Sequence, residues 1–187
     1  MKNTIVMMVA LGLLAGCGAL KPNDTAEMPT NKYGGQVMSQ NDAIGLSNWA
    51  LKDPATTQGK PELAARAIAA EDWLAGQSML TPDFGDYAPV NTSYWSVYRS
   101  QVRAAIGVAP GTPSQVVVNS LLATADALKA GTPNPGAALQ PPAFTLGPDG
   151  TLKALANLPP FPGQELAILD LDHNENRSGG NCHSPVC

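Results

Sequence analysis

The positions of proline limit which parts of this chain can form long helices. A proline inside an α-helix removes a backbone hydrogen bond and clashes with the preceding turn, so long helices need proline-free runs. Between residues 41 and 131 such runs alternate with prolines at places where a helix can begin or end. After Gly131 proline recurs too often, at Pro133, Pro135, Pro141, Pro142, Pro148, Pro159, Pro160 and Pro162. We therefore expect an all-α fold, with a small bundle of about four helices in residues 37–131 and a Pro-rich extended strap and polar tail in residues 132–187.

Apolar residues at helical spacing predict the four helices. They are expected from Asn41 to Leu51, from Pro61 to near Gly76, from a cap at Asn91 or Thr92 to Gly107, and from Thr112 to Gly131. The third helix carries an aromatic and aliphatic stripe that should be buried, formed by Trp95, Tyr98, Val102 and Ile106. The fourth begins with Thr112-Pro113-Ser114-Gln115, the pattern of a capping box. A short join between the third and fourth helices predicts an antiparallel hairpin.

The segments outside these helices are expected to be less regular. Residues 17–36 have few apolar side chains and no period, which is typical of a flexible tether. In the strap, spaced apolar residues predict contact with the bundle, and residues 152–157 and 164–171 are expected to form short helices. The net charge of −4, with 44% apolar and 14% charged residues, fits one core. Nucleic-acid binding is not expected, because binders of that class present clustered Lys and Arg and this chain has an excess of acidic residues.

The first residues have the organisation of an export signal. Met1-Lys2-Asn3-Thr4 is a short positive segment, and an apolar run of about ten residues follows it, too short to span a bilayer permanently. The run ends in Leu14-Ala15-Gly16-Cys17, which resembles the bacterial lipobox, where an apolar residue and two small residues precede the cysteine that becomes the mature N-terminus. The alternatives are an ordinary secreted protein with a cysteine in its leader, or an uncleaved hydrophobic anchor.

The lipobox resemblance implies a location and a modification. Residues 1–16 would be removed as a signal peptide, and Cys17 would carry a thioether-linked diacylglycerol and commonly a further acyl chain. Several acyl chains attach a protein stably, whereas a single chain does so only marginally. The next residue is Gly18 and not the aspartate that retains many such proteins in the inner membrane. In a Gram-negative host, the periplasmic face of the outer membrane is therefore expected.

The C-terminal tail contains the residues best suited to bind a metal. Asp170, Asp172, Asn174 and Asn176 alternate as oxygen ligands do in an EF-hand calcium loop. The loop lacks two defining residues, since Glu175 stands where the turn needs glycine and Asn181 where a bidentate glutamate is expected. A zinc or copper site with His173, His183, Cys182 and Cys187 has suitable ligand types but no standard zinc spacing. In an oxidising compartment we expect a local Cys182–Cys187 disulfide instead.

The sequence offers little support for catalysis. Both histidines lie in the polar tail, and the hydrolase, metalloprotease and phosphate-loop motifs are missing, so no catalytic residue and no cofactor are predicted. The carboxylate pairs Glu71-Asp72 and Asp83/Asp86 are expected to be solvated, because neighbouring helix residues point to different faces. The aromatic residues could line a ligand groove, although core packing is the preferred interpretation; they are Trp49, Trp73, Tyr94, Trp95 and Tyr98.

Two alanine-rich stretches suggest a wider relationship. Residues 64–70 and 103–110 look similar to segments of uncharacterised helical lipoproteins of Gram-negative bacteria. This resemblance carries no known activity. The leading hypothesis is a lipid-anchored, non-enzymatic envelope protein, held to the membrane by its lipid, whose helical domain packs against another envelope protein. The alternative is a ligand- or metal-binding lipoprotein that uses the tail or an aromatic groove, and a hydrolase comes third.

Overall fold

The computed structural model describes residues 24–77 and 88–162, apart from the side chains of residues 88–94. The described chain is all-α, as predicted, and its extended segments meet only in the isolated bridges Thr30–Gln36 and Val108–Phe144. Six helices are formed in these residues: the four expected in the bundle, the short helix expected near residues 152–157, and a short helix, α2 Pro54–Thr57, that was not predicted. They are α1 Gln40–Lys52, α2 Pro54–Thr57, α3 Pro61–Gln77, α4 Ala88–Ala105, α5 Ser114–Lys129 and α6 Gly147–Leu155.

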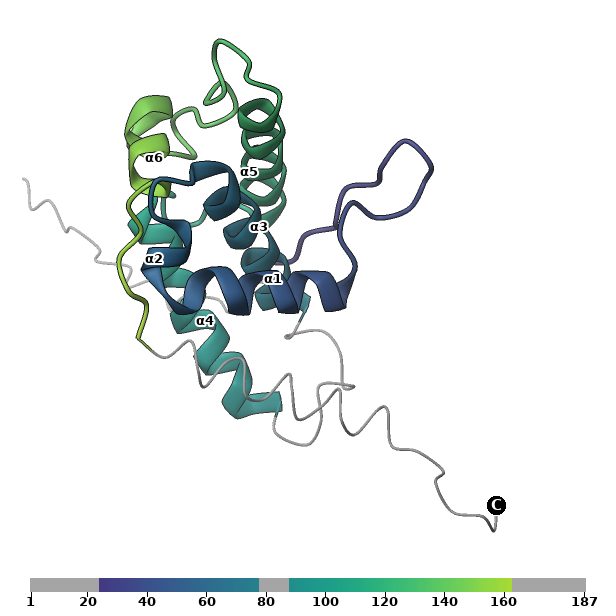
Figure 1. The fold of residues 1–187 in the computed structure, drawn as a ribbon. Coiled ribbons are helices and arrows are strands. Elements are labelled where there is room, and N and C mark those ends of the chain that lie inside the picture. Colours follow the sequence, from purple (N-terminus) through teal and green to yellow (C-terminus); the bar gives the residue numbers. More distant parts are fainter. Residues whose placement is uncertain (1–23, 78–87, 163–187) are drawn as a thin grey trace, which may run out of the picture.

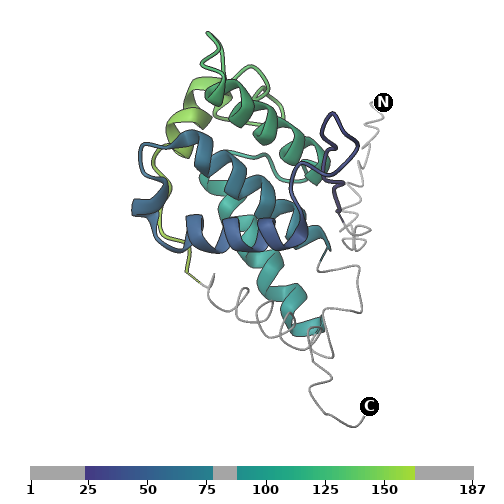
Figure 2. The ribbon, with the colours of Figure 1, turned by 45° about the vertical axis from the view of Figure 1, so that its right-hand side comes forward.

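Helix α3, the second of the four helices expected in the bundle, is the centre of the bundle. It packs most extensively against α5 and α1, and it also contacts α4, α6 and α2 (Figures 1 and 2). Most of its residues from Ala64 to Gly76 are buried, so that no face of the helix is left to solvent over these turns. The many alanines explain this arrangement, because their small side chains let neighbouring helices approach closely.

The first two helices are set by local caps. The side chain of Ser39 accepts a hydrogen bond from the Asp42 amide, and the Asp42 carboxylate in turn accepts one from the Ser39 amide. This capping box starts α1 one residue before the predicted position. Asp53 ends α1 and caps α2 through the Ala55 amide, and Pro54 is at the start of α2. Helix α1 thus ends at Lys52, one residue after the predicted Leu51.

Helix α4, the third of the four helices expected in the bundle, begins earlier than predicted. It starts at Ala88, so the expected cap at Asn91 or Thr92 is wrong; Pro89 lies in the first turn, where a missing amide hydrogen is tolerated. The predicted stripe is confirmed, because its four side chains are nearly or fully buried. Gly107, with φ of +74°, follows the helix in a left-handed conformation that favours glycine.

The predicted capping box and hairpin at α5 are both wrong. Thr112 does not cap the helix, since its hydroxyl donates to the Ala109 carbonyl over 2.8 Å. Helix α5 begins at Ser114, and the Ser114 amide donates instead to the carboxylate of Asp24, 90 positions earlier in the chain. The main neighbour of α5 is α3, and α4 runs obliquely to α5 (Figure 1). The short join therefore connects two helices that each pack mainly against α3.

The Pro-rich segment after α5 is part of the core, as the predicted strap requires. Leu139, Phe144 and Leu155 are fully buried, and the Thr145 amide and hydroxyl both donate to the Gly107 carbonyl. The short helix predicted from Leu152 is present as α6, which begins earlier, at Gly147, with proline in its first turn. The helix predicted for residues 164–171 lies outside the described residues.

Residues 24–36 are not a free tether. Ala26 and Met28 are buried in the core, and Glu27 exchanges two backbone hydrogen bonds with the side chain of Gln115 on α5. The flexible-tether prediction is wrong for this part. Ala26 and Met28 pack into the core, and the carboxylate of Asp24 accepts hydrogen bonds from the bundle. In residues 24–77 and 88–162, no helix has the length and apolar character needed to cross a bilayer.

Candidate functional site: a buried ion cluster

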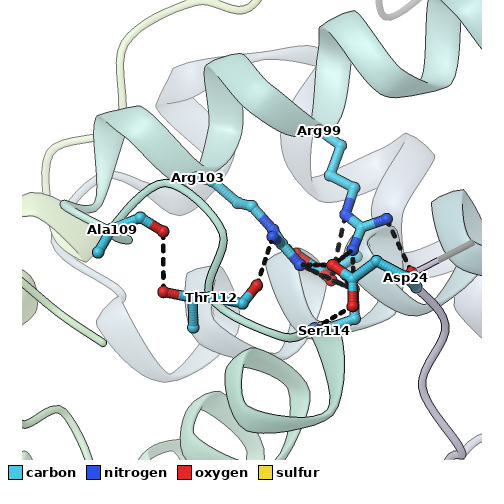
Figure 3. Close-up of polar contacts among 7 residues, drawn as sticks. Asp24, Arg99, Arg103, Ala109, Thr112 and Ser114 are labelled. Carbon is cyan, nitrogen blue, oxygen red and sulfur yellow. Dashed lines mark hydrogen bonds and ion pairs between the residues drawn. The ribbon is translucent and has the colours of Figure 1, made fainter. Parts of the chain in front are cut away.

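Four charged side chains from three separate parts of the chain meet inside the bundle. Asp24 comes from the N-terminal segment, Asp72 from α3, and Arg99 and Arg103 from α4, with Ser114 of α5 between them (Figure 3). We call these five residues the ion cluster. The two arginines are four positions apart on α4, so they extend from the same helix face. That spacing lets both guanidinium groups reach the same two carboxylates.

Arg103 and Asp72 form the best-aligned pair in the cluster. Arg103 Nε is 2.5 Å from Asp72 Oδ2, and Arg103 Nη2 is 2.8 Å from Asp72 Oδ1. Two parallel hydrogen bonds of this kind match the fork of a guanidinium to a carboxylate. Arg103 Nη1 also donates to the Thr112 carbonyl over 2.9 Å, which fixes the loop before α5.

Arg99 fastens the N-terminal segment. Its Nη2 atom donates to Asp24 Oδ2 over 2.6 Å, and its Nη1 atom donates to the Asp24 backbone carbonyl over 3.1 Å. The Nε atom of Arg99 is 3.4 Å from Asp72 Oδ1, which is an ion pair without a well-aligned hydrogen bond. Arg99 therefore links the first described residue of the chain to the central helix.

Ser114 connects the cluster to α5. Its hydroxyl donates to Asp72 Oδ1 over 2.7 Å and accepts hydrogen bonds from the Nη2 atoms of Arg99 and Arg103. Its backbone amide donates to Asp24 Oδ1 over 2.8 Å. Asp24 thus supplies the N-terminal cap that Pro113 cannot provide, and its negative charge lies at the positive end of the helix dipole.

The cluster balances its charges, with two arginines against two aspartates. The side chain of Asp72 is fully buried, Arg99 and Arg103 are nearly so, and Asp24 is 37% exposed. Burial alone would raise the pKa of Asp24, but the Ser114 amide and the two arginines lower it below its usual value. Burial alone would lower the pKa of Arg103, but its hydrogen bonds to Asp72 and the charge of Asp72 raise it above its usual value. Asp24 and Arg103 are therefore held in their charged forms by their partners.

Glu71, next to Asp72 on α3, has the opposite environment. It is fully buried, and neither carboxylate oxygen has a hydrogen-bond partner. Burial raises the pKa of Glu71 well above its usual value; the charge of Asp72 raises it further, and the two arginines partly oppose this. Burial, followed by the nearby Glu71, also raises the pKa of Tyr98. Glu71 thus keeps its proton over a pH range in which an exposed glutamate is ionised.

The prediction that Glu71 and Asp72 are solvated is wrong. Their side chains do point to different faces of α3, but every face of that helix is covered by protein at this level. The alanine-rich sequence around them and the i, i+4 spacing of Arg99 and Arg103 were the available signals. Asp83 and Asp86, the other pair, lie outside the described residues.

The remaining predicted site residues divide into two groups. Trp73, Trp95 and Tyr98 are core residues, with Tyr98 packed edge-on against Trp95 and Phe161 at centroid distances of 6.4 and 6.0 Å. Core packing is wrong for Trp49, which is 60% exposed on α1. The other candidates lie outside the described residues; they are Cys17 and the tail residues Asp170, Asp172, His173, Asn174, Cys182, His183 and Cys187. Tyr94 belongs to the first part of α4, where the structure describes the backbone only.

Comparison with protein-family models, with curated proteins and with solved structures finds no match for this chain. The resemblance to helical envelope lipoproteins therefore stays a prediction from the sequence. Among the described residues, no group of three or more His, Cys, Asp and Glu side chains is arranged to hold a metal ion. The chemistry that the geometry does provide is mutual neutralisation, because the donors and acceptors of the ion cluster are directed at one another.

Proposed function

We propose that this chain is a lipid-anchored, non-enzymatic protein of the bacterial cell envelope, with its helical domain acting as an interaction or structural module. The lipobox residues Leu14-Ala15-Gly16-Cys17 are the basis for the anchor. The Gly18 that follows favours the periplasmic face of an outer membrane. The proposed partners are the membrane, through the lipid on Cys17, and another envelope protein.

The observation that carries the proposal is the position of Asp24 in the ion cluster. Asp24 follows the proposed lipidated cysteine by seven positions and is joined to α4 through Arg99 and to α5 through Ser114. A membrane anchor needs a firm connection to the folded domain, and a charge-assisted set of hydrogen bonds to two helices provides one. The same engagement leaves these polar groups little capacity to bind or transform a substrate, which favours a non-enzymatic module.

The anchor is tested by acyl labelling in a bacterial host. Cells fed an alkynyl fatty acid should label the wild-type protein, and Cys17→Ser should abolish the label and leave unprocessed precursor or soluble protein. Cys182→Ser is the matched control, because it removes a cysteine elsewhere and should leave labelling unchanged. Fatty acid on the Cys17→Ser protein would contradict the proposed anchor.

The interaction module is tested by photo-crosslinking in intact cells. A crosslinking amino acid at Trp49, which is 60% exposed on α1, should give a discrete adduct with one envelope protein. The control position is Lys129 at the end of α5, a charged and exposed site that should give none. Absence of adducts from Trp49 and from two further exposed apolar residues on the helices, Val97 and Val116, would contradict the proposed module.

A further inference from the structure

Residues 29–37 form an ordered turn that projects from the bundle (Figure 1, dark purple). The Val37 amide donates to the Pro29 carbonyl over 2.8 Å, and the Asn31 amide donates to the Gly35 carbonyl over 2.6 Å. Gly34, with φ of +83°, takes the left-handed position that closes the turn. We call this segment the 29–37 turn.

The base of the 29–37 turn is firmly held. Met28 and Met38, on either side of it, are buried in the core. Just before Met28, the backbone of Glu27 is bonded to the Gln115 side chain by hydrogen bonds of 2.7 and 3.0 Å. The turn therefore keeps a fixed direction relative to the bundle.

The tip of the turn presents an aromatic residue and a positive charge to solvent. Tyr33 is 82% exposed, and Val37 on the returning arm is 46% exposed. Lys32 Nζ lies 4.9 Å from the centre of the Tyr33 ring, a cation–π contact that keeps the two groups together. Lys32 is the only charged residue from Pro29 to Met38, in a chain with a net charge of −4. The turn is thus a locally positive, partly apolar element on an acidic protein.

We propose that the 29–37 turn is a second membrane contact, in which Tyr33 and Val37 enter the phospholipid headgroup region and Lys32 binds anionic headgroups. Tyrosine favours this interface, because its ring is apolar and its hydroxyl is polar. A lysine there keeps its charge at the surface while its methylene chain covers apolar groups. This inference rests on the proposed lipid anchor at Cys17.

The length of chain between the proposed lipid and the bundle supports a membrane as the occupant. Seven residue steps separate Cys17 from Asp24, and a fully extended chain covers at most about 25 Å in that distance. Asp24 is fixed by Arg99 and Ser114, so the lipid cannot be farther than this from the ion cluster. The 29–37 turn continues from the same segment, five positions after Asp24, and projects from the bundle in both views (Figures 1 and 2).

Nitroxide accessibility in nanodiscs tests the proposal. The mature lipidated protein would be purified with Cys182→Ser and Cys187→Ser, and a label would be attached at Gly35→Cys. Gly35 suits a label because it is exposed, and an added Cβ would meet only Asn31, at 3.5 Å. The control label is at Lys129→Cys, at the opposite end of α5 from Ser114 and about 22 Å along that helix.

In nanodiscs of phosphatidylethanolamine and phosphatidylglycerol, the label at position 35 should lose contact with an aqueous nickel reagent and gain contact with oxygen. The label at position 129 should stay accessible to nickel. Adding Tyr33→Asp should return the label at position 35 to water, whereas Trp49→Asp, the same kind of change at another exposed aromatic residue, should not.

The outcomes separate this inference from the proposed anchor. An acylated Cys17 together with a label at position 35 as accessible to nickel as the label at 129 would overturn the membrane contact and leave the anchor standing. Spin–spin broadening between labels at position 35 would identify a second copy of the chain as the occupant and would also overturn it. Unmodified Cys17 in the purified protein would overturn the anchor and, with it, the inference.

Discussion

Replacing Asp72 by asparagine should be among the most damaging isosteric changes in this protein. The substitution keeps the shape of the side chain but removes the negative charge that both arginines face. It also places an amide donor or a neutral oxygen where Arg103 Nε donates over 2.5 Å. Removing one partner of a buried ion pair leaves the other charge uncompensated and costs about 3 to 5 kcal/mol of the free energy of unfolding.

Glu71 should limit this loss. In the wild-type protein the charge of Asp72 raises the pKa of Glu71, and Arg99 and Arg103 lower it. In Asp72→Asn the raising influence of that charge is gone, while burial still raises the pKa of Glu71 and the two arginines still lower it. Glu71 therefore ionises at a lower pH than in the wild type and restores part of the missing negative charge. The double variant Glu71→Gln/Asp72→Asn cannot respond in this way. Its free energy of unfolding should be about 1 kcal/mol lower than the sum of the two single changes predicts, within the range for neighbouring coupled residues.

The measurement is urea denaturation followed by circular dichroism, with thermal unfolding as a second readout. In a chain of this size 1 kcal/mol corresponds to about 2 to 4 °C, so Asp72→Asn should lower the midpoint by roughly 6 to 20 °C. Asp126→Asn is the matched control: Asp126 pairs with Arg66 over 2.7 Å, but its side chain is 73% exposed, and such pairs contribute about 0 to 1 kcal/mol. Equal, small losses for both variants would refute the reasoning about the ion cluster.

Three further changes test other parts of the fold. Trp95→Ala removes a ring that is 1% exposed and should cost about 3 to 5 kcal/mol, whereas Trp49→Ala, at 60% exposure, should stay within about 0.5 kcal/mol in the same denaturation assay. Gly107→Ala forces a left-handed alanine whose Cβ collides with Leu146, so thermal unfolding should report a loss of at least about 1 to 2 kcal/mol. Glu71→Gln should match the wild type near the usual glutamate pKa and become increasingly more stable than it as pH rises, because ionisation favours unfolding of the wild type until pH passes the raised pKa; urea titrations at about pH 4.5 and 7.5 check the sign.

The helices could be predicted from the sequence because their signals are local. A proline, an apolar stripe such as Trp95 to Ile106 or a glycine after the last turn affects only the helix in which it lies or which it ends. The same rules failed at α5, where Thr112 and Gln115 match a capping box but bind elsewhere. A local pattern states which bonds are available, and it does not show which distant group competes for them.

The ion cluster could not be predicted in the same way. Its bonds join residues 31 positions apart for Arg103 and Asp72, 75 for Arg99 and Asp24, and 90 for Ser114 and Asp24. The sequence alone does not show whether a helix carboxylate faces solvent or the protein interior. Glu71 and Asp72 are buried because neighbouring elements cover α3 at this level. The 29–37 turn shows the converse, since low apolar content suggested a free tether although two methionines and one aspartate are enough to fix it.

The ion cluster also gives the bundle a register that its apolar packing cannot specify alone. Alanine covers much of the central helix, and small, similar side chains fit against neighbouring helices in several positions along the axis. A shift of α3 by one turn would move Asp72 by about 5.4 Å and take it out of reach of Arg103 and Ser114. The two arginines would then lose their fully buried partner, and Asp24 alone would face two positive charges, a far larger penalty than the displaced alanine contacts. Because Asp24 binds the same groups, the correct position of α3 is also the condition for fixing the N-terminal segment, and both would be lost together.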